Sequence, residues 1–245
     1  MLQIKILLIS LFLVTTLFGE SVAVITAIKG SVSIVNLVKE SREASLGEEL
    51  YPSDRVLTAD KSMAQIVFKD ETIVTLGKNS NFYIKKYIYT NQENSSVGLN
   101  LLRGSVRVIT GKIGKMAPQK FKVATKNATI GIRGTNFTVF DGEDEVQKVY
   151  CTYGAVDVAT AEKSVQVNKN YIYTKAPSGD SEKKAFSAQM LAALNSGSFM
   201  DENELNYALS KDTSTIHKLY LMDNITEDRS RIVKQRVNDI VRDVR

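Results

Sequence analysis

The sequence predicts a mainly β fold, a sandwich or roll of short antiparallel strands followed by an α-helical tail. Short runs rich in Val, Ile, Thr, Phe and Tyr recur between about residues 22 and 174, separated by polar turns, as in all-β sandwiches and barrels. In several runs apolar and polar residues alternate, so one face of each strand is apolar. After residue 177 apolar residues instead recur every four positions, which is typical of a helix.

The N-terminus has the layout of a secretory signal peptide. Lys5 precedes an apolar run from Ile6 to Phe18, and small Gly19 and polar residues follow. A basic, an apolar and a small-residue region in this order are typical of an export signal, and the run is shorter than the ~20 residues of a membrane-spanning helix. We expect residues 1–19 to be a signal peptide cleaved near Gly19 and the protein to be periplasmic or secreted. An uncleaved membrane anchor is the alternative.

The following region, residues 20–176, is the predicted β domain. Two of its runs flank Lys69-Asp-Glu71 and predict a hairpin with a short loop. A Gly-small-Val sequence recurs at Gly30, Gly104 and Gly154, and we interpret it as a recurring unit in which glycine permits a turn or a close backbone approach. The predicted strands are 22–28, 32–38, 64–68, 72–76, 82–89, 105–110, 136–140, 146–153 and 170–174.

Residues 177–245 are predicted to form a helical C-terminal region. Phe186, Met190 and Leu194 lie four positions apart, as one stripe of a helix, and Thr226 can cap a further apolar helix. We interpret the stripe as a docking face against the β domain or against another chain. The second alternative makes the tail a means of forming a homo-oligomer.

The basic excess of the chain does not predict a nucleic-acid partner. Lys and Arg outnumber Asp and Glu by 32 to 27, and the excess is scattered among the apolar residues of the β region. DNA-binding proteins usually concentrate these residues on one face or helix. We therefore expect a solvated strand face, with attraction to an anionic surface as the alternative.

The single cysteine does not point to a catalytic thiol. Cys151 lies in a β-type run, which favours a buried structural thiol. The only histidine, His217, lies in the predicted helical region, so no Cys–His pair is expected.

Two acidic pairs are the candidates for an envelope-polymer hydrolase. Asp70/Glu71 and Asp141/Glu143 could in principle act as acid and base. Both pairs lie in polar turns, where a solvated charge is the ordinary interpretation. We expect no catalytic residues, no cofactor and no metal site.

The most specific stretch of the chain lies between Phe121 and Val139. It contains Gly131-Ile-Arg-Gly-Thr-Asn-Phe137, and it resembles the late motif of the FecR domain. The resemblance covers about residues 28–140. Glu71 stands where the family usually has a hairpin glycine, and Glu48 where it usually has aspartate. The upstream elements in family order are Gly30-Ser-Val, Leu46-Gly-Glu-Glu-Leu50, Asp54-Arg-Val-Leu-Thr58, the 64–76 hairpin and Leu101-Leu-Arg-Gly-Ser-Val106.

Five residues of this motif form the candidate site: Gly131, Arg133, Gly134, Thr135 and Phe137. The two glycines suit a sharp corner between strands, Thr135 can hydrogen-bond to turn backbone, and Phe137 is expected in the core. Arg133 could bind a carboxylate or phosphate, or pair with an acid of its own domain. We interpret the motif as structural, with a ligand contact through Arg133 as the alternative.

The resemblance implies a place in the cell envelope. In the best-known setting of the family, an outer-membrane transporter contacts a periplasmic FecR region, which regulates a sigma factor across the inner membrane. That role needs a cytoplasmic segment before the membrane helix, and only about five residues precede the apolar run here. We therefore expect an exported, non-catalytic module that binds an envelope protein or glycan, rather than a direct anti-sigma regulator. The alternatives are the hydrolase and an oligomerising structural protein of the envelope.

Overall fold

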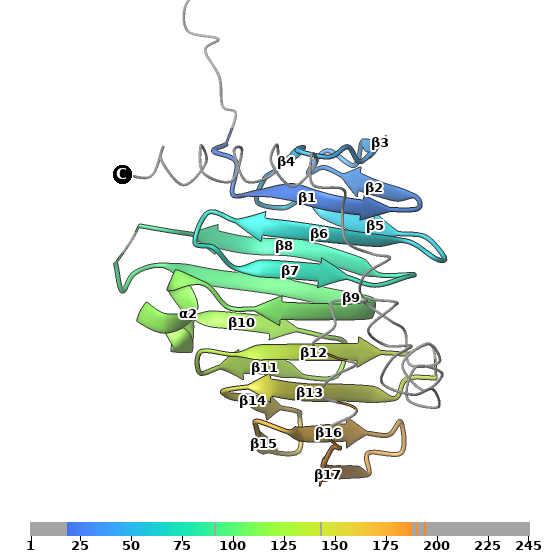
Figure 1. Cartoon of the computed structure of the whole chain (residues 1–245), viewed down its shortest axis with the longest axis vertical. Helices are drawn as coiled ribbons and strands as arrows, with labels where there is room; N and C mark the ends of the chain where they lie inside the picture. Colours follow the sequence, from blue (N-terminus) through green and yellow to red (C-terminus); the bar gives the residue numbers. More distant parts are fainter. Residues whose placement is uncertain (1–18, 91, 143, 188–189, 191–193, 195–245) are drawn as a thin grey trace, which may run out of the picture.

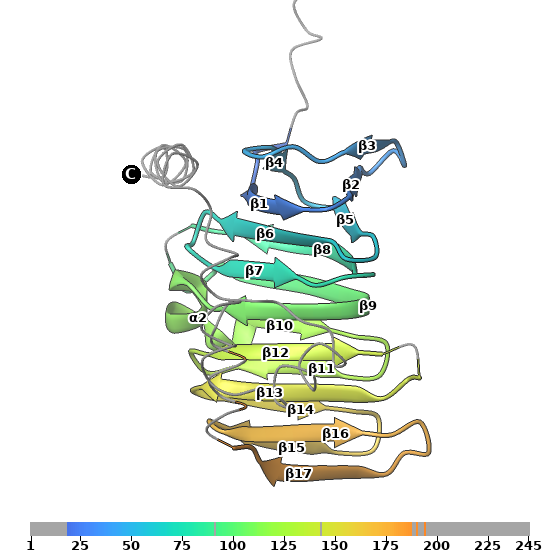
Figure 2. The same cartoon turned by 45° about the vertical axis from the view of Figure 1, so that its right-hand side comes forward.

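The computed structural model of the protein describes residues 19–90, 92–142, 144–187, 190 and 194. In this part of the chain seventeen strands form two layers that pack face to face (Figures 1 and 2). The predicted signal peptide and most of the predicted helical region lie outside the described residues. The prediction of a mainly β fold is confirmed.

The first layer, sheet A, has the strand order β4-β1-β6-β7-β9-β12-β13-β16-β17. All of its neighbouring strands are antiparallel. Its members are β1 (Ala23–Lys29), β4 (Glu49–Leu50), β6 (Met63–Phe68), β7 (Ile73–Leu76), the second half of β9 (Ser96–Ile109), β12 (Asn136–Asp141), β13 (Gln147–Tyr153), β16 (Tyr171–Lys175) and β17 (Ser181–Ala185).

The second layer, sheet B, has the order β3-β2-β5-β8-β9-β10-β11-β14-β15. Only the pair of β9 and β10 is parallel. Besides the first half of β9, its members are β2 (Val32–Val35), β3 (Ser41–Glu43), β5 (Arg55–Thr58), β8 (Asn81–Ile88), β10 (Phe121–Ala124), β11 (Thr129–Ile132), β14 (Ala155–Ala159) and β15 (Ser164–Asn168).

Successive hairpins are placed alternately in the two layers. The β6–β7 hairpin in sheet A is followed by β8 and the first half of β9 in sheet B, and the second half of β9 returns to sheet A. The chain then adds β10–β11 to sheet B, β12–β13 to sheet A, β14–β15 to sheet B and β16–β17 to sheet A. Because β9 belongs to both layers, all the strands form one hydrogen-bonded network.

The core lies between the two layers. Alternation within strands turns one apolar face of each sheet inward, as in β5, β6 and β11. Burial of each such side chain contributes about 1.5–3 kcal/mol relative to exposure. Large fully buried members come from both sheets and include Ile25, Ile66, Phe68, Phe82, Leu99 and Phe137.

A short helix, α2 (Lys112–Met116), follows β9, and a 3-10 turn at Pro118–Lys120 leads into β10. The helix closes one edge of the sandwich next to the turn between β6 and β7 (Figure 1). Its backbone is tied to that turn, since the Lys112 N–H donates to the carbonyl oxygen of Asp70 at 2.7 Å.

Two predicted strand bounds were wrong. The predicted strand 105–110 is only the second half of the fourteen-residue β9, because Gly98 and Gly104 continue a strand where their residue type suggests breaks. The predicted strand 32–38 ends at Val35, and Leu37 and Val38 lie in an exposed turn, 74 % and 71 % accessible.

The β domain also continues beyond the predicted boundary at residue 176. β17 is a strand within the region predicted to be helical. Its sequence, Ser181-Glu-Lys-Lys-Ala185, carries three charges and lies at the edge of sheet A. Charged side chains are common on edge strands because they oppose pairing with other chains. The same charges interrupt the apolar alternation by which a strand is predicted from sequence.

Candidate functional site

The residues of the predicted site lie around one corner where the chain crosses from sheet B to sheet A. Gly134 has a φ of +61°, which glycine adopts without steric penalty, and it joins β11 to β12. Gly131 instead lies within β11, opposite Lys122 and Asp157. Of the two glycines, Gly134 alone makes the corner.

Thr135 and Phe137 hold this corner to the body of the domain. The backbone N–H of Thr135 donates to Oγ1 of Thr110 at 2.8 Å, and that hydroxyl donates to the carbonyl oxygen of Thr135 at 3.1 Å. The hydroxyl of Thr135 itself is buried and has no hydrogen-bond partner among the described residues. Phe137 is fully buried in the core, as predicted.

Arg133 is the one motif residue whose side chain faces solvent, with 66 % of it accessible. Its Nε lies 3.3 Å from Oδ2 of Asp157, an exposed ion pair that contributes little to stability. Its backbone N–H donates to the carbonyl oxygen of Ala155 at 3.0 Å. The guanidinium is therefore positioned by β14 and has donors available to a partner.

The same corner geometry, a glycine with positive φ followed by a residue whose N–H donates to a hydroxyl, occurs at two further positions. Gly30 and Gly104 also have positive φ, 70° and 93°, where the chain passes between the layers. In each case the next residue donates its backbone N–H to a serine hydroxyl on a neighbouring corner, as Thr135 does to a threonine. The pairs are Ser31 N with Ser62 Oγ at 2.9 Å and Ser105 N with Ser80 Oγ at 3.0 Å.

The third copy of the recurring Gly-small-Val sequence joins β13 to β14. Gly154 has a φ of +74°, and a Cβ at this position would collide with the carbonyl oxygen of Gly134. The unit predicted from the sequence is thus a layer-crossing corner in all three copies. Its glycines are explained by the fold and need no ligand.

The outer face of sheet B carries a row of basic side chains. The strands β5, β8, β10, β11 and the first half of β9 contain no Asp or Glu. In register across three strands, Lys86 lies opposite Gly98, and Gly98 lies opposite Lys122. Lys85 is also exposed, and the guanidinium carbon of Arg55 lies 5.8 Å from the ring centroid of Tyr83. We call this surface, formed by Arg55, Tyr83, Lys85, Lys86 and Lys122, the basic face.

Two glycines keep the basic face flat. Neither Gly98 nor Gly131 has a positive φ. A Cβ at Gly98 would meet no atom closer than 3.6 Å, and one at Gly131 none closer than 3.9 Å. Steric exclusion therefore does not require glycine at either position. The absence of a side chain at Gly98 and Gly131 leaves the neighbouring lysine side chains free of contacts from these positions.

The acids considered for catalysis are committed to structural hydrogen bonds. Asp70 is fully buried, so the prediction of a solvated charge was wrong. Its carboxylate accepts from the Thr72 hydroxyl at 2.8 Å, the Thr72 N–H at 3.3 Å, the Ile113 N–H at 3.2 Å and the Tyr87 hydroxyl at 3.1 Å. Burial raises the pKa of Asp70, and these bonds oppose the rise. Glu71 is half-exposed and pairs with Lys112.

Asp141 is also buried rather than solvated. Burial raises its pKa to about 6, while the charge of Lys126 and a hydrogen bond from Gln147 oppose the rise. Gln147 in turn donates to Oγ1 of Thr125 at 2.5 Å, which links the turns of the two layers. Glu143 lies outside the described residues.

Cys151 is a free, fully buried thiol in the core, as predicted. Burial raises its pKa to about 11. The thiol is therefore protonated at neutral pH, and a thiolate nucleophile is disfavoured.

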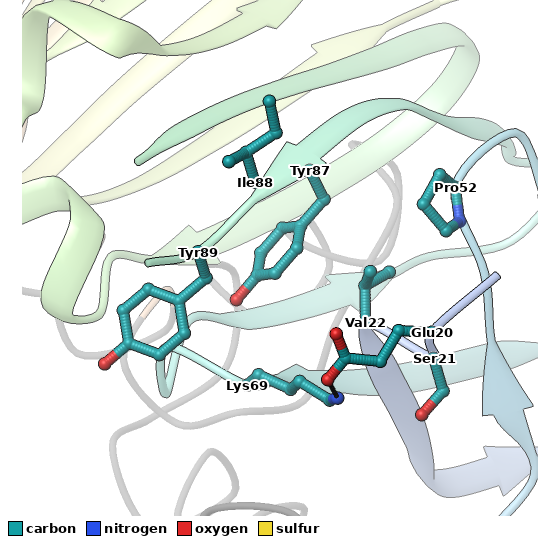
Figure 3. A pocket seen from close by; sticks show the side chains of 8 residues that line it. All are labelled: Glu20, Ser21, Val22, Pro52, Lys69, Tyr87, Ile88 and Tyr89. Carbon is teal, nitrogen blue, oxygen red and sulfur yellow. Dashed lines mark hydrogen bonds and ion pairs between the residues drawn. The ribbon is translucent and has the colours of Figure 1, made fainter. Parts of the chain in front are cut away.

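A hollow of about 450 Å³ lies beside the β6–β7 turn (Figure 3). The Nζ of Lys69 pairs across it with the carboxylate of Glu20, and the hydroxyl of Tyr87 bonds to Asp70. Sequence reasoning did not anticipate the hollow, because its walls come from segments far apart in the chain. Its lining residues are Glu20, Ser21, Val22, Pro52, Lys69, Tyr87, Ile88 and Tyr89.

Among the described residues, no group of three or more His, Cys, Asp or Glu side chains is placed to hold a metal ion. No helix in that same part of the chain is long and apolar enough to cross a membrane.

These features define a mainly β module with a structural corner motif and an exposed basic face. Residues 54–157 match the family described as FecR protein. Residues 54–157 are therefore similar to a FecR domain, and the resemblance predicted from the sequence is confirmed. The match begins and ends later than the predicted limits of 28 and 140, and it includes β13 and most of β14.

Solved structures show weaker likenesses. Two crystal structures of a candidate anti-sigma factor from Parabacteroides distasonis ATCC 8503 are 20 % identical over 58 % of this chain, with TM-scores of 0.49. The chain covers 65 % and 64 % of those chains, which is less than two thirds. A cell surface anchoring domain is 30 % identical over 26 % of this chain and 83 % of its own, with a TM-score of 0.25. These likenesses establish neither a shared function nor a shared partner. No curated protein matches the chain.

Proposed function

We propose that this chain is an exported, non-catalytic FecR-domain module of the cell envelope, which binds an anionic envelope protein or glycan through the basic face of sheet B. The observation that carries the proposal is the basic face itself. Its lysines are exposed, no acid lies on the strands that form it, and glycines leave it flat.

The chemistry of the basic face fits carboxylate or phosphate groups. Lysine ammonium groups two strands apart stand about 10 Å from each other, close to the ~8–10 Å screening length at physiological salt. Their potentials therefore add over the face and attract polyanions. Arg133 lies beside the next strand pair, where its ion pair with Asp157 offsets part of its charge.

We infer the absence of catalysis from the burial and the hydrogen bonds of the candidate carboxylates. Asp70 and Asp141 are both buried and hydrogen-bonded to their own domain. A general acid or base must reach a substrate proton within hydrogen-bond distance. The export leader predicted for residues 1–19 supports the envelope location.

Binding of defined anionic polymers tests the proposal. Full-length protein is immobilised and probed with poly-glutamate, with the polyuronate alginate and with neutral dextran, at 50 and 200 mM salt. We expect at least one of the two polyanions to bind at 50 mM salt and to bind more weakly at 200 mM salt. We expect dextran not to bind at either salt concentration. Preference for poly-glutamate indicates a protein partner, and preference for alginate a glycan.

A matched pair of variants locates the binding surface. Lys86→Glu/Lys122→Glu reverses two charges on the basic face, and we expect at least tenfold weaker binding. Lys163→Glu/Lys169→Glu makes the same change in net charge at exposed positions flanking β15, and we expect binding close to wild type. Equal losses in both variants contradict the proposal, because they indicate attraction to net charge rather than to this face.

A further inference from the structure

The hollow beside the β6–β7 turn lies between segments of the two layers, at one end of their strands (Figure 3). On the side of sheet A its wall contains Val22, which precedes β1, and Lys69, which follows β6. On the side of sheet B it contains the end of β8, at Tyr87 and Ile88, and Pro52 from the turn before β5. Its volume of about 450 Å³ lies in the range of small-molecule sites, about 300–1,000 Å³.

The positive charge of this wall is held in a fixed place. The backbone N–H of Lys69 donates to the carbonyl oxygen of Val22 at 3.0 Å. The next residue, Asp70, accepts hydrogen bonds from its own turn, from β8 and from α2. The side chain of Lys69 reaches along the hollow to the carboxylate of Glu20 (Figure 3). The ammonium group is thus carried by a turn that several other segments hold in position.

The carboxylate that pairs with Lys69 can be replaced more easily than the lysine. Among the described residues this partner is Glu20. Glu20 precedes β1, and 81 % of its side chain remains accessible within the pair. The backbone hydrogen bonds that fix this segment begin with Val22, whose N–H donates to the carbonyl oxygen of Leu50 at 2.8 Å. An ion pair with so exposed a partner contributes little to stability, so a carboxylate from solution can take the place of Glu20.

The other walls of the hollow favour an organic anion with a ring over a bare inorganic one. Pro52 and Ile88 present apolar surface, and 41 % of Ile88 is accessible. Tyr87 and Tyr89 add two aromatic rings, and such rings pack against other flat rings with their faces or edges. Ligand sites commonly combine apolar walls with a few polar groups that fix the orientation of the ligand, and Lys69 is such a group here.

We propose that the hollow binds a carboxylate carried on a six-membered ring. The carboxylate pairs with Lys69 in place of Glu20, and the ring packs against Tyr89, Pro52 and Ile88. Acidic sugars and aromatic acids share this chemistry. Glu20 then acts as a competitor that belongs to the chain itself. No residue of the basic face lines the hollow, so this inference does not depend on what binds that face.

Titration of the full-length chain, followed by the methyl NMR signal of Ile88, tests the ligand class. The ring carboxylates are benzoate and methyl glucuronoside, with benzamide and methyl glucoside as their neutral counterparts and acetate as a carboxylate without a ring. We expect a saturable shift with at least one ring carboxylate, and at least tenfold weaker binding of its neutral counterpart and of acetate. The tighter ring carboxylate identifies the source as an aromatic acid or an acidic sugar. Absence of a shift with both, or equal affinity for the neutral counterpart or acetate, overturns the proposal.

Variants of the ion pair test the exchange of carboxylates. Glu20→Gln removes the competitor, and we expect about two- to fivefold tighter binding. Glu49→Gln removes the same charge from the neighbouring β4 without touching Lys69, and we expect wild-type affinity. Lys69→Met is expected to bind at least tenfold more weakly, and Lys86→Glu/Lys122→Glu on the basic face as wild type. The proposal is overturned if Glu20→Gln binds no more tightly than Glu49→Gln, or if the variant of the basic face loses binding as Lys69→Met does.

Discussion

Two turns of sheet A bury an aspartate in different ways. In the β6–β7 turn, Asp70 receives hydrogen bonds from four donors, which lie in its own turn, on β8 and at the start of α2. In the β12–β13 turn, Asp141 relies on Gln147 and on the charge of Lys126. Burial raises the pKa of both aspartates, so the two sites differ in how many hydrogen-bond donors lose their acceptor when the carboxylate is removed, which is more at Asp70 than at Asp141.

The largest expected effect is at the saturated aspartate. Asp70→Ala leaves the Ile113 N–H, the Thr72 hydroxyl and the Tyr87 hydroxyl without their acceptor in a buried site, so we expect a loss of about 3–5 kcal/mol in the free energy of unfolding. Urea unfolding followed by circular dichroism measures it. Asp60→Ala, at an exposed turn, is the control and should change stability by under ~0.5 kcal/mol. Similar midpoints for the two variants would show that Asp70 is no anchor.

The second effect is a pH dependence at Asp141. Because burial raises the pKa of its folded state to about 6, above the ordinary 3.8, the folded state binds the proton more tightly than the unfolded chain. Its contribution to stability is full below about pH 4 and is lost as the pH rises through about 6. The difference corresponds to about 2–3 kcal/mol.

Asp141→Asn removes this titration. We expect the stability of the variant relative to wild type to rise by about 2–3 kcal/mol between pH 4 and pH 7.5, measured by urea unfolding at both limits and at pH 5 and 6. The difference between the two proteins cancels the other acids of the chain. Parallel stability curves would contradict the assignment to Asp141.

A smaller effect separates the hydroxyl of Tyr87 from its ring. This hydroxyl donates to the Asp70 carboxylate and accepts from the Asp70 N–H at 2.8 Å, whereas the ring stacks on Phe68. Tyr87→Phe keeps the ring contact and is expected to lose about 1–2 kcal/mol. Tyr83→Phe, on the outer face of the same strand, is the matched control and should lose little. An equal loss of unfolding free energy in Tyr83→Phe and Tyr87→Phe would show that the loss does not come from the hydrogen bonds between Tyr87 and Asp70.

The smallest effect is a gain at Glu71. Its φ of +68° places a non-glycine residue in the left-handed region. Glu71→Gly relieves this strain and is expected to raise the free energy of unfolding by about 0.5–1 kcal/mol, since the exposed ion pair with Lys112 contributes little. Glu71→Ala loses the same ion pair but keeps the strain, so it should not stabilise. Equal thermal midpoints of Glu71→Gly and Glu71→Ala would show that the left-handed backbone at position 71 is not strained.

Local patterns predicted the local parts of the fold. The β6–β7 hairpin follows from two alternating runs around a short polar loop, and it is confirmed. Phe137 and Cys151 lie in apolar runs and are buried. The recurring glycines are corners because left-handed backbone is a local requirement.

What depends on distant partners was not predictable. The burial of Asp70 depends on Tyr87 and Ile113, which are 17 and 43 positions away. Gly111 carries no visible signal, yet a Cβ there would collide with the backbone of the β6–β7 turn. The sequence predicted attraction to an anionic surface only as an alternative and did not locate the basic face, because Lys86 and Lys122 share a row only through the strand register.

The alternating hairpins have a consequence for how the chain can acquire its fold. From β7 onward each strand pairs with a strand that lies at most three places earlier in the chain order, such as β10 with β9, β14 with β11 and β16 with β13. Nearby pairing limits the loop-closure entropy that each step must overcome. A chain that emerges N-terminus first from a translocation channel can therefore assemble hairpin by hairpin, with each new pair templated by the last.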